Sequence, residues 1–200
     1  QNEGEWDQLV LRDLETGEVK NIVNEGSLLT PAWVQGVAVQ SWTVDSRKIV
    51  FLQSDTGVNE LKQADILTGK IEKLPLPGYT SLDQPRVSAE GRIALLASSP
   101  QASTRVISLS DGVITIHQRS TDESIPEVDL PEPYEIHWTS SDGTMVFGIY
   151  SPPANGRYEG IGLPPAVIYI HGGPTSAVGI GYHLDAAFFT SRGIGYLDVN

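Results

Sequence analysis

Short stretches of alternating apolar and polar residues, separated by turn residues, fill the first 120 positions of the chain. Segments such as Arg105-Val106-Ile107-Ser108-Leu109 alternate with a period of two, which predicts β-strands with one buried face. Polar loops and Thr-Gly or Asp-Gly pairs lie between the strands, and their glycines supply the positive φ that tight hairpin turns need. No periodic helices interrupt this pattern, so the region is expected to be all β.

The strand pattern repeats along the chain. Asp13-Leu14-Glu15-Thr16-Gly17-Glu18-Val19 matches Asp65-Ile66-Leu67-Thr68-Gly69-Lys70-Ile71 in its Asp, Thr, Gly and both aliphatic positions, and Ser108-Leu109-Ser110-Asp111-Gly112-Val113-Ile114 is a weaker third copy. A unit of about 40 to 50 residues with four strands is typical of a β-propeller blade, which buries its faces against its neighbours. A β-sandwich with similar hairpins is the alternative.

The repeat predicts half a blade over 6–23, one blade over about 33–74 and another over about 82–118. Closed propellers use roughly four to eight blades, so we expect further blades outside this sequence.

The pattern changes after residue 120. Three prolines in 125–133 indicate a linker that holds neither a helix nor a central strand. A hairpin is expected over 134–150, with Asp142 needed for its turn. The apolar run 165–170 predicts a strand buried on both faces of a parallel sheet, followed by a helix over 182–192 that ends at Gly193 and a strand over 194–199. This βαβ pattern predicts a mixed fold: propeller blades over 1–124, a linker over 125–133, and the start of an α/β domain over 134–200.

A glycine-rich turn, His171-Gly172-Gly173-Pro174, follows the apolar strand. An α/β hydrolase carries its oxyanion loop at this place, because a backbone N–H can approach a developing oxyanion where no side chain intervenes. The alternative is that Gly172 and Gly173 only allow a tight turn at the strand end.

This order of features resembles the prolyl oligopeptidase family, in which a propeller caps an α/β-hydrolase domain carrying a Ser-Asp-His triad. The most specific matches are Trp138-Thr139-Ser140-Ser141-Asp142-Gly143, Gly148-Ile149-Tyr150-Ser151-Pro152, His171-Gly172-Gly173-Pro174 and Asp198-Val199-Asn200. With His at 171, the turn is similar to the acylaminoacyl-peptidase and dipeptidyl-aminopeptidase-like branch. The resemblance implies that the Gly173 N–H is the oxyanion donor and that His171 packs and orients the loop. It also implies a serine peptidase that releases N-terminal acylated residues or dipeptides from short peptides.

The sequence contains no Gly-x-Ser-x-Gly, so we expect the triad to lie downstream of it. Ser176 has Pro174 instead of glycine two residues before it and is not the nucleophile. His117 and His137 belong to predicted strands and His183 opens the predicted helix, so all three are interpreted as surface or structural residues. Two other functions stay open: an esterase of the α/β-hydrolase fold and a non-catalytic propeller that binds peptides or proteins.

The composition narrows the expected partners. Thirteen Lys and Arg against 25 Asp and Glu give a net charge of −12, which repels nucleic acid and anionic membranes. No apolar run approaches the roughly 20 residues of a membrane span. The absence of cysteine excludes thiol chemistry and favours the cytoplasm, with a secreted or periplasmic location left open. We expect short peptides as substrates and neither a metal nor a cofactor. The oligomeric state stays open, and a homo-oligomer is one alternative.

Overall fold

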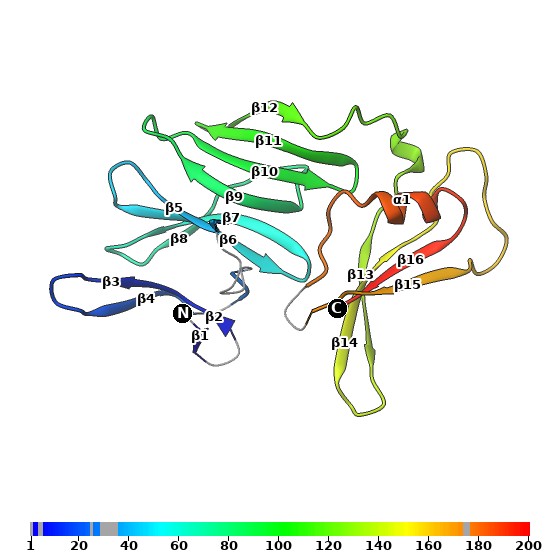
Figure 1. Cartoon of the computed structure of the whole chain (residues 1–200), viewed down its shortest axis with the longest axis horizontal. Helices are drawn as coiled ribbons and strands as arrows, with labels where there is room; N and C mark the ends of the chain where they lie inside the picture. Colours follow the sequence, from blue (N-terminus) through cyan, green and yellow to red (C-terminus); the bar gives the residue numbers. More distant parts are fainter. Residues whose placement is uncertain (1, 4–5, 25, 29–35, 174–176) are drawn as a thin grey trace. The chain divides into compact units, whose positions relative to one another are not determined.

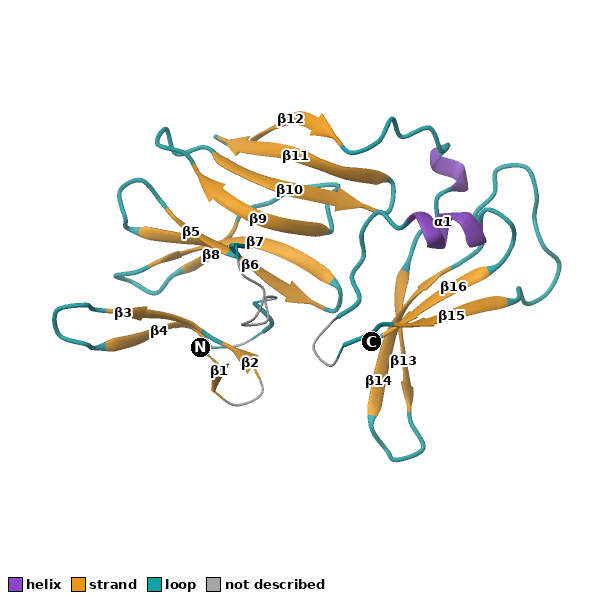
Figure 2. Cartoon of the chain, in the orientation of Figure 1, coloured by secondary structure: helices purple, strands orange, loops and turns teal. Residues whose placement is uncertain are grey.

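The computed structural model describes residues 2–3, 6–24, 26–28, 36–173 and 177–200. The chain divides into two compact units, one formed by Gln1–Ala97 with Arg105–Gln118 and the other by Ser98–Thr104 with Arg119–Asn200. Strands dominate both units (Figures 1 and 2), and the described residues also contain one α-helix and one short 3-10 helix.

Two four-stranded sheets confirm the two full blades predicted from the repeat. The first sheet pairs its strands antiparallel in sequence order: β5 (Gln40–Trp42), β6 (Lys48–Asp55), β7 (Val58–Asp65) and β8 (Ile71–Lys73). The second has its strands in the same consecutive order: β9 (Ser81–Val87), β10 (Ile93–Ser99), β11 (Ala102–Ser110) and β12 (Val113–Arg119). Four consecutive neighbouring strands are the topology of a propeller blade. Trp33, where the first blade was predicted to begin, lies outside the described residues.

The predicted half-blade is a two-stranded antiparallel hairpin of β3 (Leu9–Arg12) and β4 (Val19–Val23). A shorter antiparallel pair, β1 (Asn2–Glu3) and β2 (Trp6–Asp7), precedes it.

The repeated Asp-x-x-Thr-Gly segments form the same turn twice. In each copy an oxygen of the Asp side chain, in Asp13 and in Asp65, accepts hydrogen bonds of 2.7 to 3.0 Å from the backbone N–H groups two and three residues later. The bond from the residue three positions on is the largest cause of a lowered pKa in both carboxyl groups. The glycines, Gly17 and Gly69, have φ of +75° and +74°. The third copy differs, because Gly112 (φ +77°) ends a two-residue turn between β11 and β12.

Strand β6 is buried on both faces. Val50 and Leu52 lie in a core cluster to which both blades contribute, and its other members are Leu61, Leu76, Leu82, Ile93, Leu95, Ala97, Ile107 and Leu109. Phe51 points to the opposite face, where the second cluster also contains Ile22, Val23, Leu28 and Ala64. A sheet that packs against a neighbour on each face is what stacking of propeller blades requires.

The second unit contains a mixed four-stranded sheet in the order β13-β14-β16-β15. Its elements are β13 (Tyr134–Thr139), β14 (Met145–Ser151), β15 (Ala166–Ile170), α1 (Leu184–Thr190) and β16 (Gly195–Val199). Strands β13 and β14 form the predicted antiparallel hairpin, and β15 runs parallel to β16 with α1 between them in sequence. The predicted strand–helix–strand connection is therefore confirmed, and Gly193 (φ +81°) follows the helix as expected.

Two sequence expectations were wrong in this unit. The proline-rich linker contains one turn of 3-10 helix, η1 (Glu127–Asp129), which follows Pro126 and needs few internal hydrogen bonds. Strand β15 was expected to be buried on both faces, but it lies at the sheet edge, and Ile168 and Ile170 are 63% and 72% exposed. An apolar run predicts a strand without indicating its position in the sheet.

Candidate functional site

The glycine turn begins at the carboxyl end of β15. The parallel pairing of β15 with β16 ends at Ile170 opposite Val199, so His171 and Asn200 leave the sheet at the same edge. In open α/β sheets this edge is where ligands bind, because the loops after the strands converge there. The glycine turn therefore lies at the end of the strands where the loops of such sheets contact ligands.

The backbone conformation at position 173 is one that favours glycine over other residues. Its φ is +79°, in the left-handed region, and it is exposed. Apart from Gly173 itself and its two chain neighbours, no described atom lies within 4 Å of the place where a Cβ would be. An open, glycine-lined backbone is the property that lets an N–H approach a reacting carbonyl. The role of the Gly173 N–H as an oxyanion donor stays a prediction.

The neighbouring residues of the turn are partly accessible as well. The His171 Nδ1 atom lies 3.3 Å from the Gly172 carbonyl oxygen, and Gly172 is exposed. The contact joins the His171 side chain to the backbone of the loop. An orienting role for His171 would require a contact of this kind. Pro174 and Ser176, which the sequence analysis also considered, lie outside the described residues.

Asn200 ties the chain after the turn to the end of β16. Its Oδ1 accepts a hydrogen bond of 3.0 Å from the backbone N–H of Val178. The bond joins the segment that returns from the turn to the strand beside β15. Asn200 ends the motif Asp198-Val199-Asn200, but no role for it could be predicted from the sequence, because the bond to Val178 depends on the path of the loop.

A second group of polar residues lies between β16 and α1. Burial raises the pKa of Tyr196 to about 12, and its ring stacks on Phe189 with centroids 5.8 Å apart. Asp198, two residues on, is half-buried, and desolvation raises its pKa although nearby His183 opposes the shift. His183, which was expected to open the helix, is the N-cap of α1, and its Nδ1 accepts the Ala186 N–H at 3.2 Å. The Tyr196 ring and the His183 cap therefore stabilise the helix and its packing on the sheet.

The remaining sequence candidates have structural roles. The Asp142 Oδ1 accepts the Thr144 N–H at 2.9 Å within the β13–β14 turn, and this bond is the main cause of its lowered pKa. His117 Nε2 lies 2.8 Å from the Ser108 hydroxyl, and His137 Nε2 lies 2.8 Å from a carboxylate oxygen of Glu135.

Across the residues that the structure describes, no group of three or more His, Asp or Glu is arranged to hold a metal. Within the same residues, no helix has the length and apolarity of a membrane span.

Comparison with known proteins gives a clear result at the level of structure. No protein-family model and no curated protein matches the sequence. The crystal structure of puromycin hydrolase superposes with a TM-score of 0.87 at 29% identity, and the match covers 98% of this chain and 30% of that chain. A puromycin-hydrolyzing peptidase from Mycobacterium tuberculosis superposes equally well, with a TM-score of 0.87 at 24% identity and the same coverage.

The chain has the fold of a segment of prolyl oligopeptidase family peptidases. More distant members agree at the level of fold: Pyrococcus horikoshii acylaminoacyl peptidase matches 92% of the chain with a TM-score of 0.64 at 18% identity, over 27% of its own length. The prolyl oligopeptidase resemblance inferred from the motifs is thus confirmed, as are the propeller blades. The chain spans less than a third of the length of these relatives.

Proposed function

We propose that the intact protein is a serine-type peptidase that hydrolyses short peptides or other amides of amino acids. The observation that carries this proposal is the match of nearly the whole chain to puromycin hydrolase at 29% identity. Peptide binding draws support from a variant of that enzyme whose structure is complexed with PGG and which superposes with a TM-score of 0.83. Puromycin itself is a candidate substrate, since its amide joins an amino acid to a nucleoside.

In this proposal the second unit is the beginning of an α/β-hydrolase domain, and its glycine turn forms part of the oxyanion hole. A serine outside this sequence attacks the amide carbonyl, and the negative charge that develops on the oxygen accepts a hydrogen bond from the Gly173 N–H. Such a donor stabilises the tetrahedral intermediate more than the substrate, so it lowers the barrier. The bond between Asn200 and Val178 supports this role by holding the chain after the turn.

The propeller blades carry the specificity in this proposal. Blades that cap a hydrolase domain restrict access to short substrates, and release of N-terminal acylated residues or dipeptides is the reaction we expect. Hydrolysis of a bond near the substrate's N-terminus needs no metal or cofactor, since the triad and the oxyanion donors supply the chemistry.

The test is a substrate panel offered to the intact protein. It contains puromycin, an acetylated aminoacyl p-nitroanilide, a dipeptidyl p-nitroanilide and a simple p-nitrophenyl ester. We expect cleavage of at least one amide and loss of that activity after treatment with a serine-directed fluorophosphonate. Cleavage of the ester alone would favour the esterase alternative, and cleavage of none would favour a binding module.

A further inference from the structure

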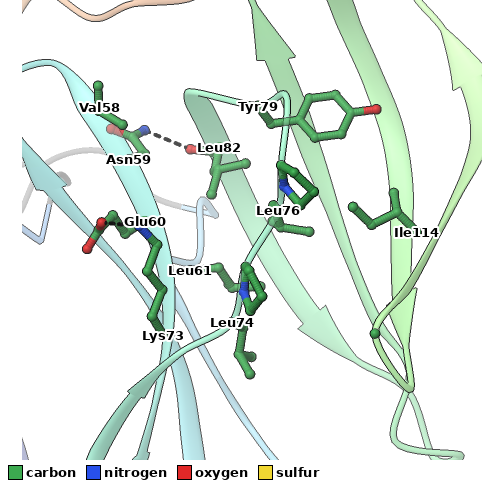
Figure 3. Close-up of a pocket in the computed structure, with 13 residues that line it drawn as sticks. Val58, Asn59, Glu60, Leu61, Lys73, Leu74, Leu76, Tyr79, Leu82 and Ile114 are labelled. Atoms are coloured by element: carbon green, nitrogen blue, oxygen red, sulfur yellow. Dashed lines mark hydrogen bonds and ion pairs between the residues drawn. The ribbon is translucent and has the colours of Figure 1, made fainter.

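The cavity between the two blades is mostly apolar, and its polar side chains have partners within the protein. Its volume is about 480 Å³, and leucine, isoleucine and proline side chains line most of it (Figure 3). The Asn59 Nδ2 group donates to the Leu82 carbonyl oxygen at 3.0 Å, and Glu60 pairs with Lys73. The glycine turn differs, because Gly173 is exposed and has no side chain. A ligand that needs a hydrogen bond therefore gains more at the turn than in this cavity.

The segment that contains the glycine turn is attached to the end of β16 at both of its ends. It starts after Ile170, which pairs with Val199 in the parallel ladder of β15 and β16. It returns at Val178, whose backbone N–H donates to the Oδ1 atom of Asn200 at 3.0 Å. Residues 171–177 therefore form a loop whose two ends are attached to two consecutive residues.

Asn200 is itself held by the sheet. Its backbone N–H donates to the Phe147 carbonyl oxygen at 3.0 Å, so the pairing of β14 with β16 continues one residue beyond the end of β16. Side chains alternate along a strand, which places the Asn200 side chain on the same face as Tyr196. That face carries α1, because the Tyr196 ring stacks on Phe189. The chain that runs from Val178 to α1 therefore passes on the side to which the Asn200 side chain projects.

Packing does not fix the direction of the Gly173 N–H. Gly172 and Gly173 have no side chains, and apart from their chain neighbours no described atom lies within 4 Å of the place where either Cβ would be. Glycine also has more backbone freedom than any other residue. The direction of this N–H therefore depends on where the two ends of the loop are attached.

We propose that Asn200 is a positioning residue of the oxyanion hole, because its bond to Val178 sets the direction of the Gly173 N–H. The inference rests on the proposed function, in which that N–H is the oxyanion donor. Asn200 does not itself touch the substrate. A misdirected donor weakens the transition state more than the bound substrate, since the negative charge develops only as the reaction proceeds. Loss of the bond should therefore lower kcat and leave KM nearly unchanged.

The test compares variants of the intact protein on the p-nitroanilide that the parent cleaves best. Asn200→Leu keeps the size of the side chain and removes the acceptor, so it should lower kcat by about tenfold and change KM by less than about twofold. Asn200→Asp keeps an acceptor oxygen and should retain kcat within about threefold of the parent. Amide hydrogen exchange at Val178 should become faster in Asn200→Leu and stay slow in Asn200→Asp.

Asn155→Leu is the matched control, because Asn155 makes bonds of the same kind elsewhere in the second unit. Its Oδ1 accepts the Arg157 N–H at 2.8 Å, and its Nδ2 donates to the Ser191 carbonyl oxygen at 2.6 Å. Loss of these bonds should lower the thermal midpoint and leave kcat at the parent value. The control thus separates a general loosening of the unit from an effect on the oxyanion donor.

A loss of kcat in Asn200→Leu that is absent from both Asn200→Asp and Asn155→Leu supports the proposal. Parent kcat in Asn200→Leu, or an equal loss in any two of the three variants, would overturn it and leave the peptidase function standing. If the parent cleaves no amide, the proposed function fails and the positioning role fails with it. Circular dichroism checks the fold of each variant. Should Asn200→Leu not fold, Val178→Pro removes the donor N–H instead of the acceptor and carries the same expectation.

Discussion

The core shared by the two blades can be tested by removing one buried side chain. Leu61 on β7 is 1% exposed and packs in the cluster that contains Leu52 from the same blade and Leu95 and Ile107 from the next. Replacing it with alanine leaves a cavity that side chains from both blades line. Leucine-to-alanine substitutions at such sites cost about 2 to 5 kcal/mol, and we expect the upper half of that range because two sheets cannot easily close around the gap.

The same chain supplies a matched control. Leu67 is 77% exposed in the Asp-x-x-Thr-Gly turn after β7, so Leu67→Ala should change stability by less than about 0.5 kcal/mol. Urea titration gives the midpoints, and a loss of about 4 kcal/mol shifts the midpoint by more than 1 M for ordinary slopes. Hydrogen exchange in β6 and β10 tests whether both blades loosen. If Leu61→Ala and Leu67→Ala have similar midpoints, or if β10 keeps its protection, the shared core is refuted.

Three further substitutions have expected outcomes. Gly148→Ala would bring a Cβ to 2.6 Å from the Asp198 carbonyl oxygen, so the β14–β16 pairing should weaken by about 1 to 3 kcal/mol, measured by urea titration. Glu60→Gln should destabilise at pH 7, because hydrogen bonds from Lys73 and Lys62 lower the pKa of Glu60 below 4.5. That stabilisation is lost as the pH falls from 4.5 through the lowered value, so thermal midpoints of variant and parent should converge in acid. Asp198→Asn should have the opposite effect. Desolvation raises the Asp198 pKa above 3.8, so the parent loses stability as the pH rises from 3.8 through that raised value; the variant should melt higher at pH 7, with no difference below about pH 3.8. A parent that melts higher than Asp198→Asn at pH 7, or a Glu60→Gln deficit that persists in acid, would contradict these assignments.

The sequence predicted what depends on local chemistry. The repeated Asp-x-x-Thr-Gly turn could be recognised because Asp13 and Asp65 bond to N–H groups only two and three residues away. Strand alternation and glycine placement located the blades, the β13–β14 hairpin and the strand–helix–strand connection for the same reason. The position of the glycine turn at the carboxyl end of a strand could be predicted because an apolar strand directly precedes it.

What the sequence could not predict depends on pairing between distant segments. The exposure of Ile168 and Ile170 follows from the position of β15 at the sheet edge, which no feature of the run itself encodes. The opposition of Lys62 and Lys73 depends on the register of β7 and β8, and a shift of β8 by one residue would move Lys73 to the other face of the sheet. The bond from Val178 to Asn200 likewise requires a loop path that the sequence alone does not define.

The most direct test of the proposed function measures kcat of the intact protein after substitution of Gly173. Alanine strains a backbone with φ +79° and turns the N–H away from the oxyanion, so Gly173→Ala should lower kcat on an aminoacyl p-nitroanilide by about 100-fold and change KM little. Gly162→Ala is the control, because Gly162 has φ +86° and equally open surroundings in a separate exposed loop, and it should retain the parent kcat. A Gly173→Ala variant as active as Gly162→Ala would contradict the assignment of the glycine turn to catalysis.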